Sequence, residues 1–238
     1  MTDDDFRPSD SFVRAINEQL NQFNLERIVL LPASRYSLDE LTEAYNAARA
    51  DYVIPMPMST SQFQEFIEIY DINLSASCVA VDTVMSNIVG MGLLGLRSGR
   101  AWISRFGILP NSRNSTIGKL LMEQLIKAAK QYGSSEIAME MISTYEEGIE
   151  LAEILGFEPH REFIIGRRPP ETTLHGTPSV LNGVTHVQGR EALEWLKDRS
   201  GRIDWLNDLI TFQHISERLE GIEYREDTPH GIIHGRII

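Results

Sequence analysis

The segment from residue 108 to residue 118 combines residue types that could bind a phosphate group. It reads ILPNSRNSTIG and joins a predicted strand ending at Ile108 to a predicted helix starting near Ile117. A strand that runs directly into a helix aims free backbone N–H groups outward, and the positive end of the helix dipole adds to them. Arg113 and Lys119 bring positive charge to an otherwise acidic chain. Spacing alone supports an anion site and an ordinary strand-to-helix turn equally.

The histidines near the C-terminal end raise the question of a metal site. His230 and His234 have the i, i+4 spacing of a helical metal site, but the apolar residues between them favour an extended segment. In a strand, residues four apart lie about 13 Å from each other, too far to share one ion. We therefore expect no metal site here.

The composition limits the class of protein and its partners. The chain has 238 residues with a net charge of −12, which argues against a nucleic-acid partner because it repels phosphate backbones. The single cysteine, Cys78, rules out an intramolecular disulfide. The N-terminus lacks a signal-like apolar core, and no run approaches a membrane span. We expect a folded cytoplasmic protein with no membrane partner.

Between residues 27 and 168, hydrophobic periodicity predicts a strand, two helices, three sequential antiparallel strands, and then a helix, a strand, a helix and a strand. Capping and turn residues mark their ends, for example a Ser-x-x-Glu capping box at Ser37 and a glycine C-cap at Gly133. The expected strands are residues 27–32, 78–81, 88–96, 101–108, 137–142 and 163–166. The expected helices are residues 38–48, 61–70, 117–132 and 146–155.

The two ends of the chain carry patterns of their own, outside this central part. Apolar residues at helical spacing predict a helical brace within residues 1–26. A loop rich in Thr, Gly and Pro follows Arg168, and we place a domain boundary there. Residues 169–238 then form a C-terminal extension. We expect helices over residues 190–197 and 205–219, and edge strands over residues 231–233 and 237–238.

The order of these elements resembles that of the GNAT family of N-acetyltransferases. That family carries a hydrophobic-x-Pro-x-x-[Arg or Gln]-x-x-Gly-x-[Gly or Ala] signature, which Ile108, Pro110, Arg113, Ile117 and Gly118 match here. A Leu-Gly-Phe sequence at residues 155–157 is also similar to the end of the family's fourth helix. The resemblance covers residues 27–168 and leaves roughly the last third of the chain unexplained.

The resemblance implies an α/β (α+β) fold with a mixed, mostly antiparallel central sheet flanked by helices. It also implies acetyl-CoA (coenzyme A) as co-substrate, an amine acceptor and no metal. Main-chain groups of Phe106, Gly107 and Ile108 would pair with pantetheine and face the thioester. The residues that would hold the pyrophosphate follow in the loop and the first helical turn: Arg113, Asn114, Ser115, Thr116, Ile117, Gly118 and Lys119.

The catalytic positions of the family are matched less closely. Ala152 stands where many members have a tyrosine general acid, and alanine cannot donate a proton. Tyr145, at the start of the same helix, is a candidate for a substitute acid, with simple packing of its aromatic ring as the alternative. Glu140 is the best-placed carboxylate for a water-mediated base, with a solvated strand residue as the alternative.

Three functions remain open at this point. The first is an N-acetyltransferase that acylates an amine of a small molecule or peptide, with the C-terminal extension covering the cleft or forming a homodimer contact. The second is a degenerate GNAT fold that binds coenzyme A as a sensory or interaction module without turnover. It is suggested by Ala152, and by Asn114 and Thr116, which stand where the family commonly has glycine. The third is an interaction protein organised by its tail.

Overall fold

The computed structural model describes residues 27–113, 115–164, 184–197, 199, 204–228 and 231–237 of the 238-residue chain. The chain divides into two compact units, one ending at Phe157 and one beginning at Glu158, and each unit is described by itself. This division comes earlier than the boundary expected after Arg168. The helical brace expected within residues 1–26 lies outside the described residues.

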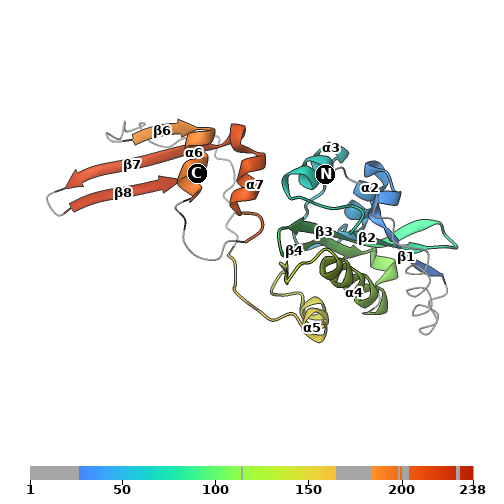
Figure 1. Ribbon diagram of the computed structural model, residues 1–238. Coiled ribbons are helices and arrows are strands. Elements are labelled where there is room, and N and C mark those ends of the chain that lie inside the picture. Colours follow the sequence, from blue (N-terminus) through green and yellow to red (C-terminus); the bar gives the residue numbers. More distant parts are fainter. Residues whose placement is uncertain are drawn as a thin grey trace. The chain divides into compact units, whose positions relative to one another are not determined.

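A five-stranded sheet organises the N-terminal unit (Figure 1). Its strands lie side by side in chain order: β1 (Ile28–Pro32), β2 (Cys78–Asp82), β3 (Asn87–Arg97), β4 (Arg100–Ile108) and β5 (Glu136–Met139). Neighbouring strands are antiparallel, except that β4 and β5 are parallel and are joined by a helical crossover. The predicted mixed, mostly antiparallel sheet is confirmed.

Helices and short 3-10 turns connect these strands: η1 (Ala33–Arg35), α2 (Leu38–Ala48), α3 (Thr60–Ile69), η2 (Pro110–Ser112) and α4 (Ser115–Gln131). Helix α5 (Glu146–Ile154) follows the last strand of the sheet. The predicted capping box at Ser37 is present, and Ser59 forms a second one at the start of α3. Gly133, just after α4, has a φ of 79°, the left-handed conformation expected of a glycine C-cap.

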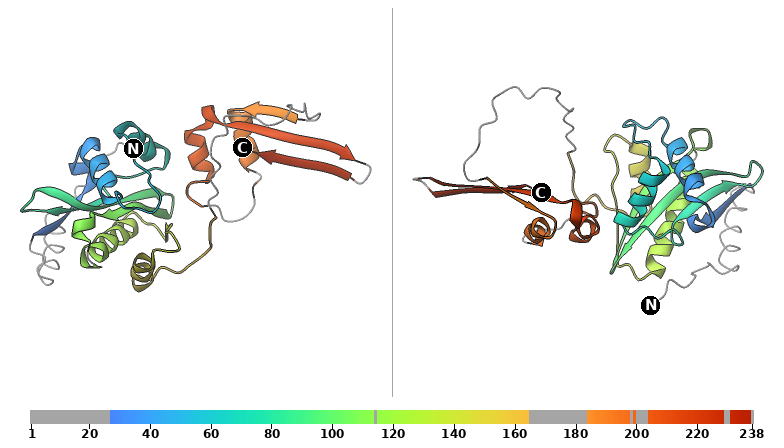
Figure 2. Two further views of the ribbon diagram at one scale, coloured as in Figure 1. Left: turned by 180° about the vertical axis from the view of Figure 1, so that it is seen from behind. Right: turned by 90° about the horizontal axis from the view of Figure 1, so that it is seen from above.

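The alternation of side chains along β4 shows which helices cover which face of the sheet. Trp102 packs against Phe66 of α3, with ring centroids 6.0 Å apart. Its neighbours Ala101 and Ile103 point the other way, into the core cluster that contains the buried side chains of α4. Helices α2 and α3 therefore cover one face and α4 covers the other (Figures 1 and 2).

Strand β4 carries a bulge that changes this alternation. Arg105 and Phe106 together lie opposite the single residue Gly92 of β3. Arg105 has a φ of 48°, a left-handed conformation that is uncommon for a residue with a long side chain. After the bulge, Phe106 packs against the same core cluster as Ile103, three residues before it.

Beyond the bulge, β4 separates from β5. Their pairing ends at Ile103 and Met139, although β4 continues to Ile108. The strand predicted over residues 137–142 is therefore wrong at its C-terminal end, because β5 stops at Met139 and Glu140 follows it. Once the bulge has changed the course of β4, the residues after Met139 have no strand to pair with. We call residues 104–108, on the side from which β5 departs, the open edge of β4.

The C-terminal unit contains a three-stranded antiparallel sheet with two helices and a 3-10 turn between its first two strands. Its elements are β6 (Val184–Gln188), α6 (Arg190–Lys197), α7 (Leu209–His214), η3 (Ser216–Arg218), β7 (Glu220–Thr228) and β8 (Gly231–Ile237). Helix α6 matches its prediction. Strand β8 confirms the extended structure predicted at residues 231–233 and at residue 237, and it joins the two segments into one strand. Strands β6 and β7 were not predicted.

Two further predictions for secondary structure are wrong. The helix expected over residues 205–219 is reduced to α7 and η3, because the Asp208 side chain caps a helix that starts only at Leu209. The strand expected over residues 163–166 is not formed at Phe163 and Ile164, which are irregular and exposed; the rest lies outside the described residues. No helix in the described part of the chain has both the length and the apolar character needed to cross a bilayer.

Candidate functional site

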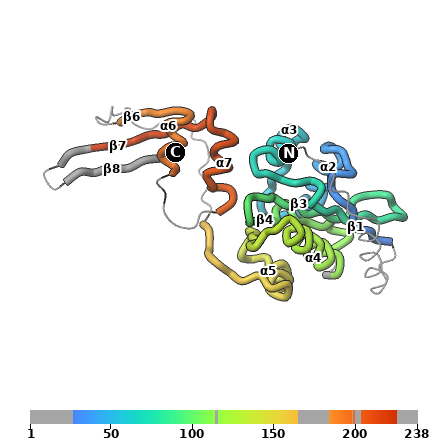
Figure 3. Tube along the Cα trace, in the orientation of Figure 1, coloured from blue at the N-terminus to red at the C-terminus, as the bar shows by residue number. Residues whose placement is uncertain are grey.

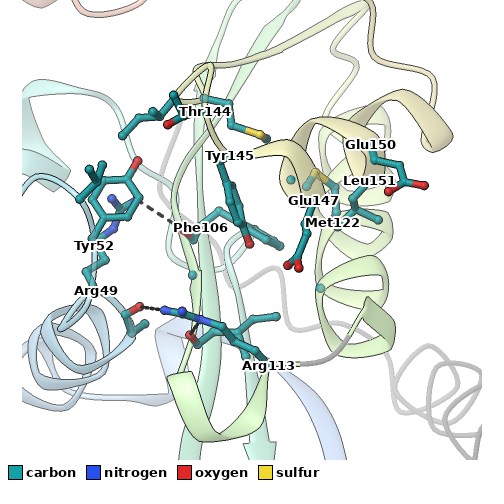
Figure 4. A pocket seen from close by; sticks show the side chains of 18 of the residues that line it. Arg49, Tyr52, Phe106, Arg113, Met122, Thr144, Tyr145, Glu147, Glu150 and Leu151 are labelled. Carbon is teal, nitrogen blue, oxygen red and sulfur yellow. Dashed lines mark hydrogen bonds between the residues drawn. The ribbon is translucent and has the colours of Figure 1, made fainter.

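A cavity of about 690 Å³ lies beside the open edge of β4 (Figure 4). Its walls come from the end of α2 and the loop after it, from β4, from the start of α4, and from α5 with the loop before it. Figure 3 follows the chain from β4 into α4 and onward to α5. The cavity therefore lies where the segment singled out in the sequence meets two other parts of the fold.

The open edge of β4 contributes main-chain groups to this cavity. Phe106, Gly107 and Ile108 line it, beyond the point where β5 leaves the sheet. The carbonyl of Phe106 accepts a hydrogen bond from Arg49 Nη2 at 3.4 Å, and the carbonyl of Ile108 accepts one from Arg113 Nε at 3.2 Å. Two arginine side chains thus take the place of a neighbouring strand along this edge.

Two glycines allow the walls of the cavity to approach each other. A Cβ on Gly107 would lie 3.2 Å from the Cβ of Ala48, so a side chain there would press on the end of α2. A Cβ on Gly118 would lie 3.4 Å from side-chain carbons of both Ile108 and Leu151. The absence of these side chains keeps α2, α4 and α5 close to β4.

Arg113, the arginine predicted to bind pyrophosphate, forms a two-point ion pair with Asp51. Its Nη1 lies 2.7 Å from Oδ2 and its Nη2 lies 2.6 Å from Oδ1, and Nη2 also donates to the carbonyl of Ala48. These hydrogen bonds hold the pKa of the Asp51 carboxyl below its usual range and raise the pKa of Arg113. The guanidinium is thus positioned at the cavity by a carboxylate with the bidentate geometry of a small anion.

The rest of the predicted pyrophosphate loop divides between cavity and core. Gly118 lines the cavity, whereas Ile117 is 2% exposed and packs in the core, and Lys119 pairs with Glu123 of α4. Thr116 lies in the first turn of α4, where it does not need the left-handed conformation of a glycine. Ser115 is the first residue of α4, and Asn114 lies outside the described residues.

Tyr145 lies at the N-cap of α5 and lines the cavity. It is 49% exposed, and Figure 4 shows its ring projecting into the space near Glu147. A Cβ on Gly148 would lie only 2.4 Å from this ring, so the glycine is what lets the ring fold over the first turn of α5. Ala152, at the position of the usual tyrosine acid, is buried in the same helix.

Glu140 is not among the residues that line the cavity. It follows the last residue of β5, and its Oε2 accepts a hydrogen bond from Trp102 Nε1 at 2.5 Å. Trp102 comes from the part of β4 that is still paired with β5. Glu140 thus lies on the α2–α3 side of the sheet, where Trp102 packs against Phe66 and Tyr70. Among the described residues, no group of three or more His, Cys, Asp or Glu side chains is arranged to hold a metal.

Sequence reasoning missed the contribution of the residues after α2. Arg49, Asp51 and Tyr52 all line the cavity, and the Arg49 guanidinium stacks on Tyr52 with 4.5 Å from Cζ to the ring centroid. No spacing rule links them to residues 106–118, which lie more than fifty residues later. The one signal in the sequence that could have indicated them is that Arg49, Asp51 and Tyr52 directly follow the end of the helix predicted over residues 38–48.

Comparison with known protein families gives one match that covers the cavity. The model of the acetyltransferase (GNAT) family matches residues 39–157, half of the chain. This range contains every residue that lines the cavity, from Ala48 to Ile154. A comparison with curated proteins gives no match.

Solved structures with similar folds share little sequence with this chain. Glucosamine-6-phosphate N-acetyltransferase from Arabidopsis thaliana is 15% identical with a TM-score of 0.45, covering 59% of this chain and 97% of its own. An acetyltransferase from Trypanosoma brucei is 18% identical with a TM-score of 0.43, covering 59% and 98%. A transcriptional regulator from Bacillus halodurans is 20% identical with a TM-score of 0.47, covering 59% and 99%. None of these likenesses identifies an acceptor.

Proposed function

Because this chain belongs to the acetyltransferase (GNAT) family, we propose that it transfers an acetyl group from acetyl-CoA to an amine of a small molecule or peptide. The observation that carries this proposal is the cavity beside the open edge of β4. A strand edge without a neighbouring strand offers N–H groups to an extended amide chain such as pantetheine. Such a chain would share the Phe106 and Ile108 carbonyls with the side chains of Arg49 and Arg113.

The residues around the cavity fit such a co-substrate. Phe106, Gly107 and Ile108 would bind the pantetheine through their main chain, and Ile108 is joined by Met122 and Leu151 as apolar lining. The N-terminal turn of α4, which includes Thr116 and Gly118, would face the pyrophosphate with the positive end of the helix dipole. We propose Arg113 and Lys119 as the accompanying cations, and Asn114 and Ser115 as the loop that shapes the site.

The reaction requires proton transfers as well as positioning. The amine nitrogen forms a bond to the thioester carbonyl carbon, the carbon–sulfur bond breaks, and the sulfur leaves as a thiolate that takes up a proton. The attacking ammonium must first lose a proton, and we propose that Glu140 accepts it through water. Tyr145 lines the cavity with a half-exposed side chain, and we propose it as the proton donor to the thiolate in place of the family's tyrosine.

The proposal is tested by cofactor binding followed by turnover. Coenzyme A and acetyl-CoA at millimolar concentration are expected to raise the melting temperature of the purified protein, because ligands that bind only the folded state stabilise it. Adding a broad panel of amines to the acetyl-CoA complex is expected to release free thiol. If millimolar cofactor leaves the melting temperature unchanged, the acyltransferase proposal is wrong.

A second candidate is a coenzyme A-binding module without turnover. The observation that favours it is Ala152, which replaces the usual acid and cannot donate a proton to the leaving thiolate. Such a module would show the rise in melting temperature but release no thiol with any amine. The same pair of measurements therefore separates the two candidates.

A further inference from the structure

Arg105 is placed unusually for a charged residue. It lies on the bulge of β4 with a φ of 48°, and the bulge puts it on the same face of the sheet as Trp102, toward α2 and α3. A left-handed residue with a long side chain is strained and persists only where its surroundings hold it in place. The surroundings here are aromatic, so the strained backbone holds a positive charge among apolar rings.

The guanidinium of Arg105 rests against aromatic rings from two helices. Its Cζ lies 4.0 Å from the centroid of Phe66 and 5.4 Å from that of Tyr45. A second arginine, Arg49, approaches the same tyrosine, with its Cζ 5.3 Å from the ring centroid. Two positive charges therefore share Tyr45 as a neighbour, and cation–π contacts hold both in place.

No carboxylate of a described residue forms an ion pair with either of these charges, although Glu140 has a favourable electrostatic effect on Arg105. The Nε atoms of Arg49 and Arg105 are buried, and neither has a hydrogen-bond partner within the described part of the chain. Neither arginine forms an ion pair with any described residue: the nearby Asp51 is bound by Arg113. Burial lowers the pKa of Arg105, and the charge of Arg49 lowers it further. Two guanidiniums that share an aromatic neighbour in a partly buried setting would be stabilised by binding an anion.

The position of this pair connects it to the proposed reaction. Arg49 lines the cavity, and its Nη2 donates to the carbonyl of Phe106 on the open edge of β4. Arg105 is the residue just before Phe106, and Glu140, the proposed base, exerts a favourable electrostatic effect on Arg105. An anion held by the two arginines would therefore lie close to the strand edge and to the group that takes up the proton.

We propose that Arg49 and Arg105 bind an anionic group, a carboxylate or a phosphate, on the acceptor, so that the substrate is an amine that also carries a negative charge. This inference rests on the proposed acyltransferase function and narrows its substrate class. Guanidinium groups pair with both anions through parallel N–H donors. The aromatic rings of Tyr45, Tyr52 and Phe66 keep the guanidiniums in place and reduce their exposure to water.

The test compares acceptors that differ only in the anionic group. Thiol release is measured at saturating acetyl-CoA with phenylalanine against phenethylamine, β-alanine against ethylamine, and phosphoethanolamine against ethylamine. In each productive pair, kcat/KM is expected to be at least about tenfold higher for the anionic member, because a charged hydrogen bond is lost in the other. The amino-acid and phosphate pairs show which anion the site prefers.

Variants then locate the effect. Arg105→Gln and Arg49→Gln are expected to bring the ratio within each pair close to one, mainly by raising KM for the anionic amine. Arg105→Lys, which keeps the charge and serves if Arg105→Gln does not fold, should retain part of the preference. Arg35→Gln removes an exposed arginine elsewhere and should leave the ratio unchanged.

Several outcomes would overturn the proposal. Equal rates within every pair for the unmodified protein would do so, as would a preference that survives both glutamine variants. A loss of coenzyme A affinity in Arg105→Gln as large as the loss for the acceptor would assign the pair to the cofactor instead. The affinities of the same amines for the coenzyme A complex, measured by calorimetric titration, make the test independent of turnover. If no amine releases thiol but anionic amines still bind through the two arginines, the catalytic proposal fails and the anion site stands.

Discussion

Arg113 and Asp51 join the strand-to-helix loop to the end of α2 through two hydrogen bonds, of 2.7 Å and 2.6 Å, at the edge of the cavity. The carboxylate presents two oxygens to the guanidinium, as a phosphate group would. Both side chains are about half exposed, so water and salt weaken the pair. A bound pyrophosphate would therefore compete with Asp51 for Arg113, and this competition gives the first two predictions.

Arg113→Glu is expected to abolish the rise in melting temperature caused by coenzyme A. The change removes a cation from the cavity and places a second carboxylate near Asp51, so the phosphates meet repulsion instead of attraction. Thermal denaturation with and without the cofactor measures the effect. Lys130→Glu, which makes the same charge change at the far end of α4, is the control and should keep the rise. A variant that still responds to the cofactor would show that Arg113 does not bind it.

Asp51→Asn is expected to tighten coenzyme A binding by roughly two- to fivefold at low salt, because the variant frees Arg113 and removes a negative charge from the cavity. Calorimetric titration at two salt concentrations measures the change, which should shrink at high salt. Glu43→Gln removes an exposed charge from α2 and serves as the control. Weaker binding in Asp51→Asn would mean that Asp51 positions Arg113 for the cofactor and does not compete with it.

The effect of Asp51→Asn on coenzyme A affinity is expected to be constant between about pH 5 and pH 8, because an ordinary carboxyl group titrates below this range. Arg113 depresses the pKa of Asp51 in the folded protein, so the stabilisation by the pair is fully present above the unfolded pKa. It is lost only as the pH falls through the lower, folded value. The ratio of coenzyme A affinities between Asp51→Asn and the unmodified protein should therefore not vary across this range. A midpoint within it would show that Asp51 is not ionised as the geometry requires.

The sequence predicted most of the N-terminal unit because its strands and helices carry clear periodic patterns. Helix α2 and the start of α5 fall at the predicted residues. The end of β5 could not be predicted in this way, since the AMEMIS sequence continues an alternating pattern past Met139. What ends the strand is the bulge in the neighbouring β4 at Arg105, and a bulge is a property of the pairing between strands.

The sequence predicted only one wall of the candidate site, the loop from Ile108 to Gly118. The loop from Ile108 to Gly118 was found because a strand running into a helix is a local pattern with a local physical meaning. Arg49 and Asp51 reach the same cavity from a helix end far away in the sequence, and only the packing of α2 on β4 brings them there. Local periodicity contains no information about such a contact.

Glu140→Gln is expected to spare coenzyme A binding and to slow acetyl transfer by roughly 10²-fold, the usual contribution of a general base. The amide oxygen of the glutamine can still accept the hydrogen bond from Trp102 Nε1, so the local structure should persist. Coenzyme A titrations and single-turnover rates at saturating acetyl-CoA measure the binding and the transfer step separately. A loss of binding equal to the loss of rate would refute the role as base and point to a structural one.

Cys78 is expected to be unreactive toward thiol reagents in the folded protein. This matters because the turnover assay measures free thiol. It is 3% exposed on β2, and burial raises the pKa of its thiol to about 12. At pH 8 the native protein should therefore react very slowly, and unfolding in denaturant should expose one thiol per chain. Labelling followed by mass spectrometry measures both. Fast labelling of the native protein would contradict the burial of β2 beneath α4, while labelling that accelerates only with denaturant would confirm that released coenzyme A is the sole thiol in the assay.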